Sequence, residues 1–348
     1  MAKDNEKTNE LVVGVDLGGT KILAAVITAD GKILGQAKRK TKPEAGTESV
    51  IDRIVKTVDD ALGSAKLTRS DVRAVGIGAP GPIDPDTGTV LMAPNLNGWE
   101  NVALAKMLRD QLDLPIFLDN DVNVGTLGEY VYGAGRGASD VIGVFVGTGV
   151  GGGLIIGGQL RSGARHAAGE IGHMIVLADG PFCGCGNRGC IEALASRTAI
   201  VQSLRMAVLS GRKTVLADAL AGGGVERLSS GALAQAWKAN DTLTVEVLSR
   251  VQHYLGLHIA SLVNFMDPEL IVLGGGVIEA LGAGYVGEIT NLCQLASWSD
   301  AIAARCATDP NLTLFGSNYQ DVFAFLMLIL VLVFRPLGLL GERVSERA

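Results

Sequence analysis

The chain has 348 residues, enough for two domains of ordinary size, and 48% of them are hydrophobic, so each domain can bury a core. Its formal net charge of −6 argues against a general nucleic-acid-binding protein, which presents clustered basic residues. Residues 1–10 are polar and lack the hydrophobic segment of a secretory signal. These features predict a cytoplasmic protein whose partners are not nucleic acids.

The N-terminal part predicts strands around a glycine turn. Residues 11–15 are hydrophobic and run into Asp16-Leu-Gly-Gly-Thr-Lys21, residues 22–27 form a second hydrophobic run, and Asp30-Gly31 turns into residues 32–34. Backbone N–H groups of such a turn could bind a phosphate. Because glycine turns between strands are common, this motif alone is a weak signal.

A helix and two further strands are predicted next. Residues 47–62 have hydrophobic side chains at helical spacing, and residues 72–77 read as a strand that ends in a Gly/Pro-rich turn over 78–82. Asn95 lies in a loop, where its side chain would either bind sugar hydroxyls or cap the helix over 102–112. A buried strand over 115–118 ends at Asp119-Asn120-Asp121, and a helix over 122–132 follows. Carboxylates at the carboxyl end of a strand lie where α/β proteins bind ligands.

The middle of the chain repeats the plan of the N-terminus. Residues 141–146 form a strand that enters Gly147-Thr-Gly149, followed by a strand over 154–156, a Gly157-Gly158 turn and residues 159–160. We therefore expect two lobes of related topology, each with a glycine turn. The glycines also match a dinucleotide-binding fingerprint, which we reject because that motif needs a helix after the glycines, and a strand pattern follows here.

The C-terminal half is predicted to be mainly helical. Residues 191–209, 233–237 and 242–265 have helical patterns, and Asp267-Pro268 ends the last of these. A strand over 270–273 leads into Gly274-Gly275-Gly276, a third glycine turn, which could admit an adenosine.

A cysteine cluster predicts a metal site. Cys183, Cys185 and Cys190 fall within eight residues, glycines separate them, and His173 lies ten residues before the first. One histidine and three cysteines form a common structural zinc site, because Zn²⁺ prefers four tetrahedral nitrogen and sulfur ligands. The alternative is a group of ordinary reduced cysteines with His173 packed in a core. An odd cysteine count and the lack of a secretory signal argue against a disulfide framework.

Together these motifs resemble the ROK family of sugar kinases and sugar-responsive repressors, over about residues 11–281. The resemblance rests on the glycine turns, Asp119-Asn-Asp121, Gly169-Glu-Ile-Gly-His173 and the cysteine cluster, in that order. It implies a two-lobed α/β, actin-like hexokinase (ribonuclease H-like) fold with an N-terminal lobe over 11–122 after the polar extension 1–10. It also implies a C-terminal lobe over 123–315 that contains a zinc loop at 173–190.

The resemblance further implies an ATP-dependent kinase that phosphorylates a hexose, most simply glucose to glucose 6-phosphate, with Mg²⁺ and structural Zn²⁺ and as a homo-oligomer. Asp121 would accept the proton of the sugar hydroxyl, and Asp16 would orient Mg²⁺. The implied sugar-binding residues are Gly81, Asn95, Asn120, Asp121, Glu170, His173 and Glu192. The implied ATP- and phosphate-binding residues are Asp16, Gly18, Gly19, Thr20, Lys21, Gly147, Thr148, Gly149, Gly274, Gly275 and Gly276. The implied zinc ligands are His173, Cys183, Cys185 and Cys190.

The C-terminal part departs from the family pattern. Residues 312–315 could form the family's strand, but residues 322–334 are uninterruptedly apolar and resemble the end of a branched-chain amino-acid transporter permease. This run is shorter than the roughly 20 residues that span a bilayer. We expect residues 316–348 to contain a helix buried in protein; a membrane-associated tail and a spliced or frame-disrupted terminus are the alternatives.

Two other functions compete with the hexose kinase. A sugar-sensing repressor of the same family would carry a DNA-binding helix-turn-helix before the first glycine turn, and only ten residues precede residue 11. A membrane transport component would need several hydrophobic spans, and the sequence offers one short run. N-acetylmannosamine and fructose remain alternative kinase substrates. The sequence therefore favours a cytoplasmic sugar kinase.

Overall fold

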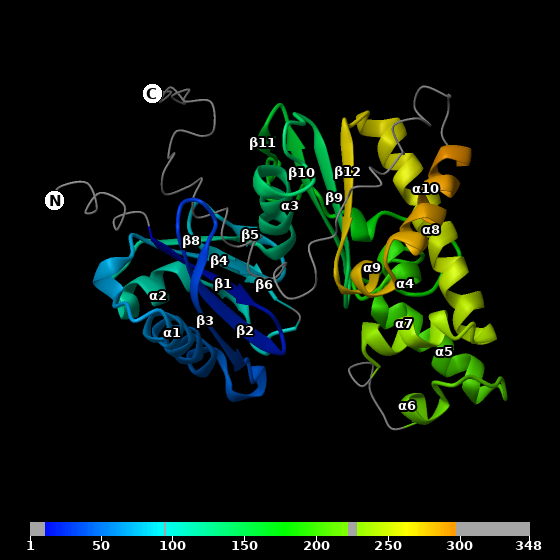
Figure 1. Cartoon of the computed structure of the whole chain (residues 1–348), viewed down its shortest axis with the longest axis horizontal. Coiled ribbons are helices and arrows are strands. Elements are labelled where there is room, and N and C mark those ends of the chain that lie inside the picture. Colours follow the sequence, from blue (N-terminus) through cyan, green and yellow to red (C-terminus); the bar gives the residue numbers. More distant parts are fainter. Residues whose placement is uncertain (1–10, 94, 222–227, 297–348) are drawn as a thin grey trace. The chain divides into compact units, whose positions relative to one another are not determined.

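The computed structural model in Figure 1 describes residues 11–93, 95–221 and 228–296, which fold as two α/β units. Of these residues, unit 1 contains those up to Ser139 together with Gly153–Ala168. Unit 2 contains Asp140–Gly152 and the residues from Gly169 onward. The predicted strand at 312–315 and the apolar run at 322–334 lie outside the described residues.

Unit 1 is built on a five-stranded mixed sheet of order β3-β2-β1-β4-β8. β1 pairs antiparallel with β2 and parallel with β4, and β4 pairs parallel with β8. The bounds are β1 (Val12–Leu17), β2 (Lys21–Ile27), β3 (Ile33–Lys40), β4 (Val75–Ala79) and β8 (Ile116–Asn120). The register aligns Asp16 with Gly78 and Gly78 with Asp119, so β1, β4 and β8 end at the same edge of the sheet.

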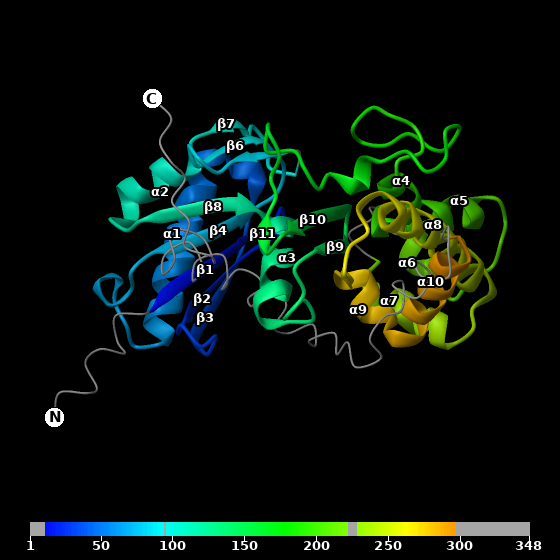
Figure 2. The same cartoon turned by 90° about the horizontal axis from the view of Figure 1, so that it is seen from above.

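Helices cover both faces of this sheet. Successive side chains of a strand point to opposite faces, so alternate residues of β2 pack against different helices. Ala24 and Val26 of β2 join the core cluster that contains the buried stripe of α1 (Thr47–Ser64) and the buried residues of α2 (Leu104–Leu112). Ala25 and Ile27 instead pack with Val131 and Tyr132 at the end of α3 (Asp121–Tyr132). Figure 1 shows α1 and α2 on one side of this sheet and α3 on the other, and Figure 2 shows the same elements from above. The predicted helix over 47–62 is confirmed as α1, whose apolar positions are buried.

A small antiparallel sheet of unit 1 was not predicted. It consists of β5 (Ile83–Asp84), β6 (Thr89–Met92) and β7 (Glu100–Val102), in the order β5-β6-β7. These strands have two to four residues, so they show almost no alternation in the sequence.

Unit 2 combines parallel strands with a group of helices. β9 (Val141–Val146) pairs parallel with β12 (Leu270–Gly274), and the hydrogen-bonded order around them is β11-β10-β9-β12. β10 (Val150–Ile156) continues from unit 2 into unit 1, where it pairs with β11 (Gln159–Leu160). The helices are α4 (Ile191–Ala195), α5 (Arg197–Leu209), α6 (Ala217–Ala221), α7 (Ser230–Lys238), α8 (Thr242–Met266), α9 (Gly276–Leu281) and α10 (Ala283–Ala296).

The predicted helical segment over 191–209 is confirmed, but it is divided into α4 and α5 by a break at Ser196. Ser196 has an extended backbone, and its hydroxyl accepts a hydrogen bond from Ala199 N at 3.1 Å, so it ends α4 and caps α5. The predicted long helix over 242–265 is confirmed as α8, whose C-cap residue Asp267 has a left-handed conformation. Among the described helices, none combines the length and hydrophobicity that a bilayer-spanning segment requires.

Candidate sugar, phosphate and metal sites

In unit 1, three predicted site segments follow parallel strands that end at one sheet edge. β1 leads into Gly18, β4 into the turn with Gly81, and β8 into Asn120 and Asp121. Ligands of open α/β sheets bind at the carboxyl ends of such strands. The register therefore brings the predicted phosphate turn and part of the predicted sugar set to the same edge of unit 1.

In the first glycine turn, protein donors occupy the carbonyl oxygens of Gly18 and Thr20. Gly18 N donates to Lys21 O at 2.9 Å, and Thr41 donates to this turn twice, from its hydroxyl to Gly18 O at 2.6 Å and from its amide to Thr20 O at 3.0 Å. Asn95 packs against the turn, since a Cβ on Gly19 would lie 3.1 Å from Asn95 Cβ. The predicted residues Gly18, Gly19, Thr20 and Asn95 therefore form one cluster.

Asn120 and Asp121 have different positions at the start of α3. Asn120 is the N-cap residue: its Oδ1 accepts hydrogen bonds from the amides of Val122 and Asn123. Its Nδ2 donates to Gly81 O at 3.0 Å, which places two predicted sugar-binding residues in contact. Asp121 is the first helical residue and half-buried. The helix cap is thus Asn120, and Asp121 Oδ1 shares the amide of Val122 with it at 2.9 Å.

Asp119 lies on the buried side of the same segment. Only 8% of it is exposed, and it accepts hydrogen bonds from Asn120 N at 2.6 Å and Asn123 Nδ2 at 3.0 Å. Burial raises the pKa of Asp119, and the two hydrogen bonds and the charge of His166 partly offset this rise. Asp119 therefore belongs to the support of the strand end.

Unit 2 repeats this arrangement with two glycine turns. β9 leads into Gly147 and β12 into Gly275, and a Cβ on Gly275 would lie only 2.6 Å from Val146 O. Gly275 also has φ +89°, a region that glycine adopts without strain. The predicted Gly147–Gly149 and Gly274–Gly276 turns therefore meet at the carboxyl ends of β9 and β12.

The start of α5 holds the Gly147–Gly149 turn. Arg197 N donates to Gly147 O at 2.9 Å, Thr198 Oγ1 donates to Thr148 O at 2.8 Å, and Arg197 Nη2 donates to Thr148 Oγ1 at 3.0 Å. Neither Arg197 nor Thr198 was predicted as a site residue. No sequence signal links them to a turn nearly fifty positions earlier, because the contact depends on the break between α4 and α5.

The four predicted zinc ligands converge. The ligand atoms of His173, Cys183, Cys185 and Cys190 all lie within 4.8 Å of one another. Cys183 Sγ is 3.6 Å from His173 Nδ1, and Cys185 Sγ is 3.7 Å from Cys190 Sγ. A tetrahedral zinc site with bonds of about 2.3 Å to sulfur and 2.0 Å to nitrogen separates its ligands by about 3.5–3.8 Å. The side chains therefore fit a tetrahedral metal ion.

The protonation of these thiols bears on metal uptake. Burial raises the pKa of the Cys183 thiol to about 12 and also raises the pKa of Cys190. A hydrogen bond from the Asn187 backbone lowers the pKa of the exposed Cys185 thiol. Metal binding must therefore displace protons from the two buried sulfurs.

Glu170, His173 and Glu192 surround this cluster. His173 Nδ1 faces Cys183, whereas His173 Nε2 lies 4.0 Å from Glu170 Oε2. Glu192 accepts hydrogen bonds from the Cys183 thiol at 3.6 Å and from Val150 N at 3.1 Å. The cluster thus connects the predicted sugar-binding residues of unit 2 with the end of the Gly147–Gly149 turn.

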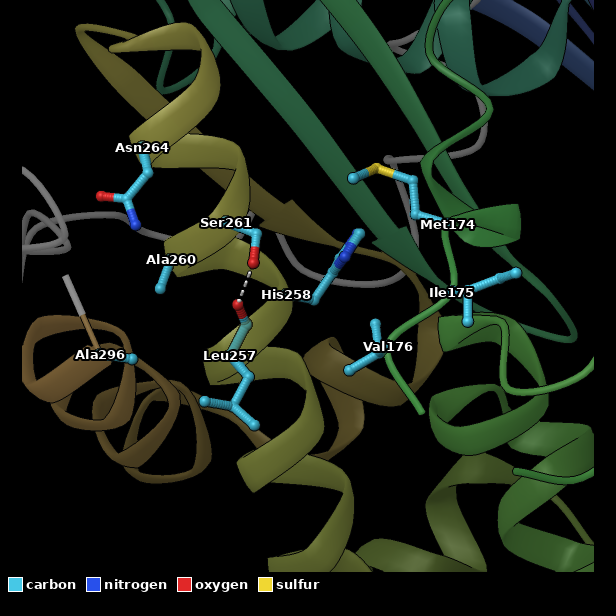
Figure 3. A pocket seen from close by; sticks show the side chains of 9 residues that line it. All are labelled: Met174, Ile175, Val176, Leu257, His258, Ala260, Ser261, Asn264 and Ala296. Carbon is cyan, nitrogen blue, oxygen red and sulfur yellow. Dashed lines mark hydrogen bonds between the residues drawn. The ribbon is translucent and has the colours of Figure 1, made fainter. Parts of the chain in front are cut away.

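Figure 3 shows a pocket of about 250 Å³ that these predictions did not include. It lies between α8, residues 174–176 and the end of α10. His258 is buried at its wall, its Nε2 has no hydrogen-bond partner among the described residues, and desolvation lowers its pKa to about 4. Because Met174 directly follows His173, the pocket borders the metal loop without containing a predicted site residue.

A second group that could hold a cation lies in unit 1. His166 Nε2 is 3.7 Å from Asp84 Oδ1 and 3.8 Å from Asp86 Oδ2. Hydrogen bonds, chiefly from Thr87, lower the pKa of Asp84, and Asp86 is largely exposed.

Comparison with known proteins gives consistent matches. The model of the ROK family matches residues 12–294. A glucokinase of Thermotoga maritima is 36% identical over 269 residues, which are 77% of this chain and 83% of that protein. A xylose repressor of Caldicellulosiruptor bescii is 31% identical over 278 residues, which are 80% of this chain and 67% of that protein. The crystal structure of a ROK family glucokinase from Streptomyces griseus, in complex with glucose and AMPPNP, superposes with a TM-score of 0.74 at 33% identity, covering 90% of this chain and 98% of that one.

Proposed function

The chain belongs to the ROK family, and we propose that it is a glucokinase that transfers a phosphoryl group from ATP to glucose. The observation that carries the proposal is Asp121, at the carboxyl end of β8 beside the cap residue Asn120, with the helix cap already supplied. The relatives named glucokinase support glucose as the substrate. The same matches support the actin-like, hexokinase-type fold expected from the sequence.

The proposed mechanism rests mainly on positioning and charge. Asp121 accepts the proton of the attacking sugar hydroxyl, because a neutral hydroxyl is a poor nucleophile at neutral pH. The amides of Gly18 and Gly147 already donate within their turns, to Lys21 O and Gly149 O, so the remaining amides of the Gly18–Thr20 and Gly147–Gly149 turns bind phosphate oxygens. Asp16, near the end of β1, would orient Mg²⁺, and a bound Mg²⁺ would neutralise phosphate charge.

For the metal loop we propose zinc, held by His173 Nδ1 and the three cysteine sulfurs. The ligand separations fit a closed tetrahedral site, which has a structural role. With its Nδ1 on the metal, His173 would turn Nε2 toward the sugar together with Glu170. Bound there, zinc would fix the orientation of His173 in the proposed sugar site.

A sugar-responsive regulator is the second candidate, because a xylose repressor also covers most of this chain. Such a regulator would bind sugar without phosphorylating it. The purified protein should be assayed for ADP formation with ATP and each of glucose, mannose, N-acetylmannosamine, fructose and allose, and then with polyphosphate in place of ATP. We expect glucose-dependent ADP release, which a hexose-binding regulator would not produce. Sugar binding without turnover for every sugar and both donors would contradict the kinase.

A further inference from the structure

Arg197 brings a positive charge to the turn that the proposed function assigns to nucleotide phosphates. It is the first residue of α5, and its Nη2 donates to Thr148 Oγ1 at 3.0 Å. The Thr148 side chain is exposed, so its hydroxyl is accessible to a ligand. Arg197 Nε is buried and has no acceptor among the described residues, so the bond to Thr148 is the contact that orients the guanidinium.

The backbone around this contact is held in place. Arg197 N and Thr198 Oγ1 occupy the carbonyl oxygens of Gly147 and Thr148, at 2.9 and 2.8 Å. These oxygens would otherwise repel a phosphate. Because Ser196 caps α5 immediately before, the guanidinium starts from a fixed backbone and loses less conformational freedom when it binds an anion.

The glycine turn of unit 1 serves as an internal comparison. There Thr41 occupies the carbonyl oxygens of Gly18 and Thr20, with its hydroxyl and its amide. Both turns therefore have their carbonyls covered by a threonine hydroxyl and a backbone amide. Only in unit 2 does the residue that supplies this amide also carry a cationic side chain.

We propose that Arg197 is a positioning residue for the phosphates of a nucleoside triphosphate, an inference that rests on the proposed function. Its N–H occupies a lone pair of Thr148 Oγ1, so that the hydroxyl hydrogen remains to donate to a phosphate oxygen. Its positive charge also favours the phosphate groups over a neutral nucleoside. Arg197 thus raises affinity for the charged part of the nucleotide and leaves the nucleoside and the sugar unaffected.

The test uses the full chain with Arg197→Met and measures binding of ATP, ADP and adenosine together with the KM values for ATP and glucose. Loss of a charge-assisted hydrogen bond should weaken ATP binding and raise its KM roughly 10- to 100-fold. Binding of adenosine and the KM for glucose should stay at the wild-type level. Arg205→Met, exposed on the same helix, is the matched control and should change none of these values.

A second variant separates positioning from folding. Thr148→Val should weaken ATP binding as well, and adding Arg197→Met to it should cost less than the sum of the two single changes, because the residues act as a unit. Arg197→Gln keeps a donor without the charge and should show an intermediate loss of ATP affinity. If Arg197→Met is too unstable to purify, Arg197→Gln and Thr148→Val carry the test.

The outcomes for Arg197 and for the kinase are distinguishable. Wild-type ATP affinity in Arg197→Met, or an equal loss for ATP and adenosine, would overturn the role of Arg197 even if the wild type phosphorylates glucose. A lowered melting temperature with unchanged ATP affinity would also overturn it, because Arg197 would then only anchor α5. A wild type that binds ATP but phosphorylates no sugar would contradict the kinase, while the binding measurements would still decide on Arg197.

Discussion

Asn120 and Asp121 are adjacent in the chain but contribute different things to the proposed site. Asn120 accepts hydrogen bonds from two backbone amides and donates one from its side chain to Gly81 O, so it links β8, α3 and the turn after β4. Asp121 is the first residue of α3, and the helix dipole favours a negative charge at this N-terminal end. A change at Asp121 should therefore impair the chemistry, whereas a change at Asn120 should impair folding.

We predict that Asp121→Asn lowers kcat by about 10²–10⁴-fold, the usual contribution of a positioned general base. That loss corresponds to roughly 3–5 kcal/mol of activation free energy. Since Asn120 remains as the cap, the melting temperature should change little. Steady-state kinetics and a thermal melt of the same preparation check both parts. A kcat near that of the wild type would remove Asp121 from the mechanism.

Asp119→Asn is the matched control, two positions earlier on β8. Asn keeps the oxygen that accepts hydrogen bonds from Asn120 N and Asn123 Nδ2. The folded-state pKa of Asp119 is raised, so its neutral form is favoured in the folded protein and its ionisation destabilises the fold as pH rises. Removing the charge should therefore preserve kcat and leave stability at pH 7 equal or higher.

The buried histidine of α8, His258, should govern stability in acid. Desolvation lowers the pKa of His258 from 6.5 to about 4, so the folded protein binds fewer protons than the unfolded chain between these values. The stability contributed by neutral His258 is complete above pH 6.5 and is lost as pH falls toward 4, by up to about 3 kcal/mol. We predict that His258→Leu flattens this dependence in urea denaturation at pH 7 and pH 5.

His253 provides the control for that measurement, since it lies on the same helix, α8, but is exposed. His253→Leu should keep the wild-type loss of stability between pH 7 and pH 5. A His258→Leu variant with the same pH dependence as the wild type would show that other groups cause the acid sensitivity.

At the scale of elements, hydrophobic periodicity predicted the long helices and buried strands. It failed where a single hydrogen bond determines the point at which a helix ends. α1 and α8 each have a sustained buried stripe, which the sequence displays directly. The break at Ser196 depends on one hydroxyl capping α5, although the residues on both sides favour a helix. The contact between Arg197 and Thr148 was unpredictable for the same reason, because it exists only once that break is made.

The metal loop is the element for which the sequence was most informative, and it gives a direct test. We predict one zinc per chain, lost in Cys185→Ser, with an increased KM for glucose. The physical reason is that Cys183, a neighbour of Cys185 in the cluster, contacts both His173 and Glu192, so losing the metal frees both side chains. Metal analysis and sugar kinetics of the purified variant provide the measurement.

Asp179→Asn is the control for the loop, because Asp179 is exposed and its side chain is outside the ligand set. It should retain zinc and the wild-type KM for glucose. Wild-type protein purified without chelator and found to contain no zinc would contradict the metal assignment.

At the scale of the whole molecule, the internal repeat of the sequence predicted related topologies in the two units. β2-β1-β4 in unit 1 corresponds to β10-β9-β12 in unit 2, and in each unit the strand before the glycine turn pairs parallel with a later strand. Residue spacing alone could not show that β10 passes from one unit to the other, because local sequence patterns do not reveal which distant residues pack together.

The proposed function also predicts how the whole chain responds to its sugar. A ligand that binds only the folded protein stabilises it by about 2.7 kcal/mol at 100 times its Kd. Saturating glucose should therefore raise the melting temperature by several degrees, in the wild type and equally in Asp121→Asn, because that variant retains sugar binding. Glu170→Ala should lose most of the shift, since Glu170 lies beside His173 in the proposed sugar site.

L-glucose is the control sugar, since it has the same composition as D-glucose and the opposite handedness, so it should give no shift. Equal shifts for the two sugars would indicate a nonspecific solvent effect instead of a site. A wild-type shift that persists in Glu170→Ala would place the sugar elsewhere. A shift that is present in the wild type and absent in Asp121→Asn would show that Asp121 binds the sugar as well as accepting its proton, and the kinetic loss in that variant would then be divided between KM and kcat.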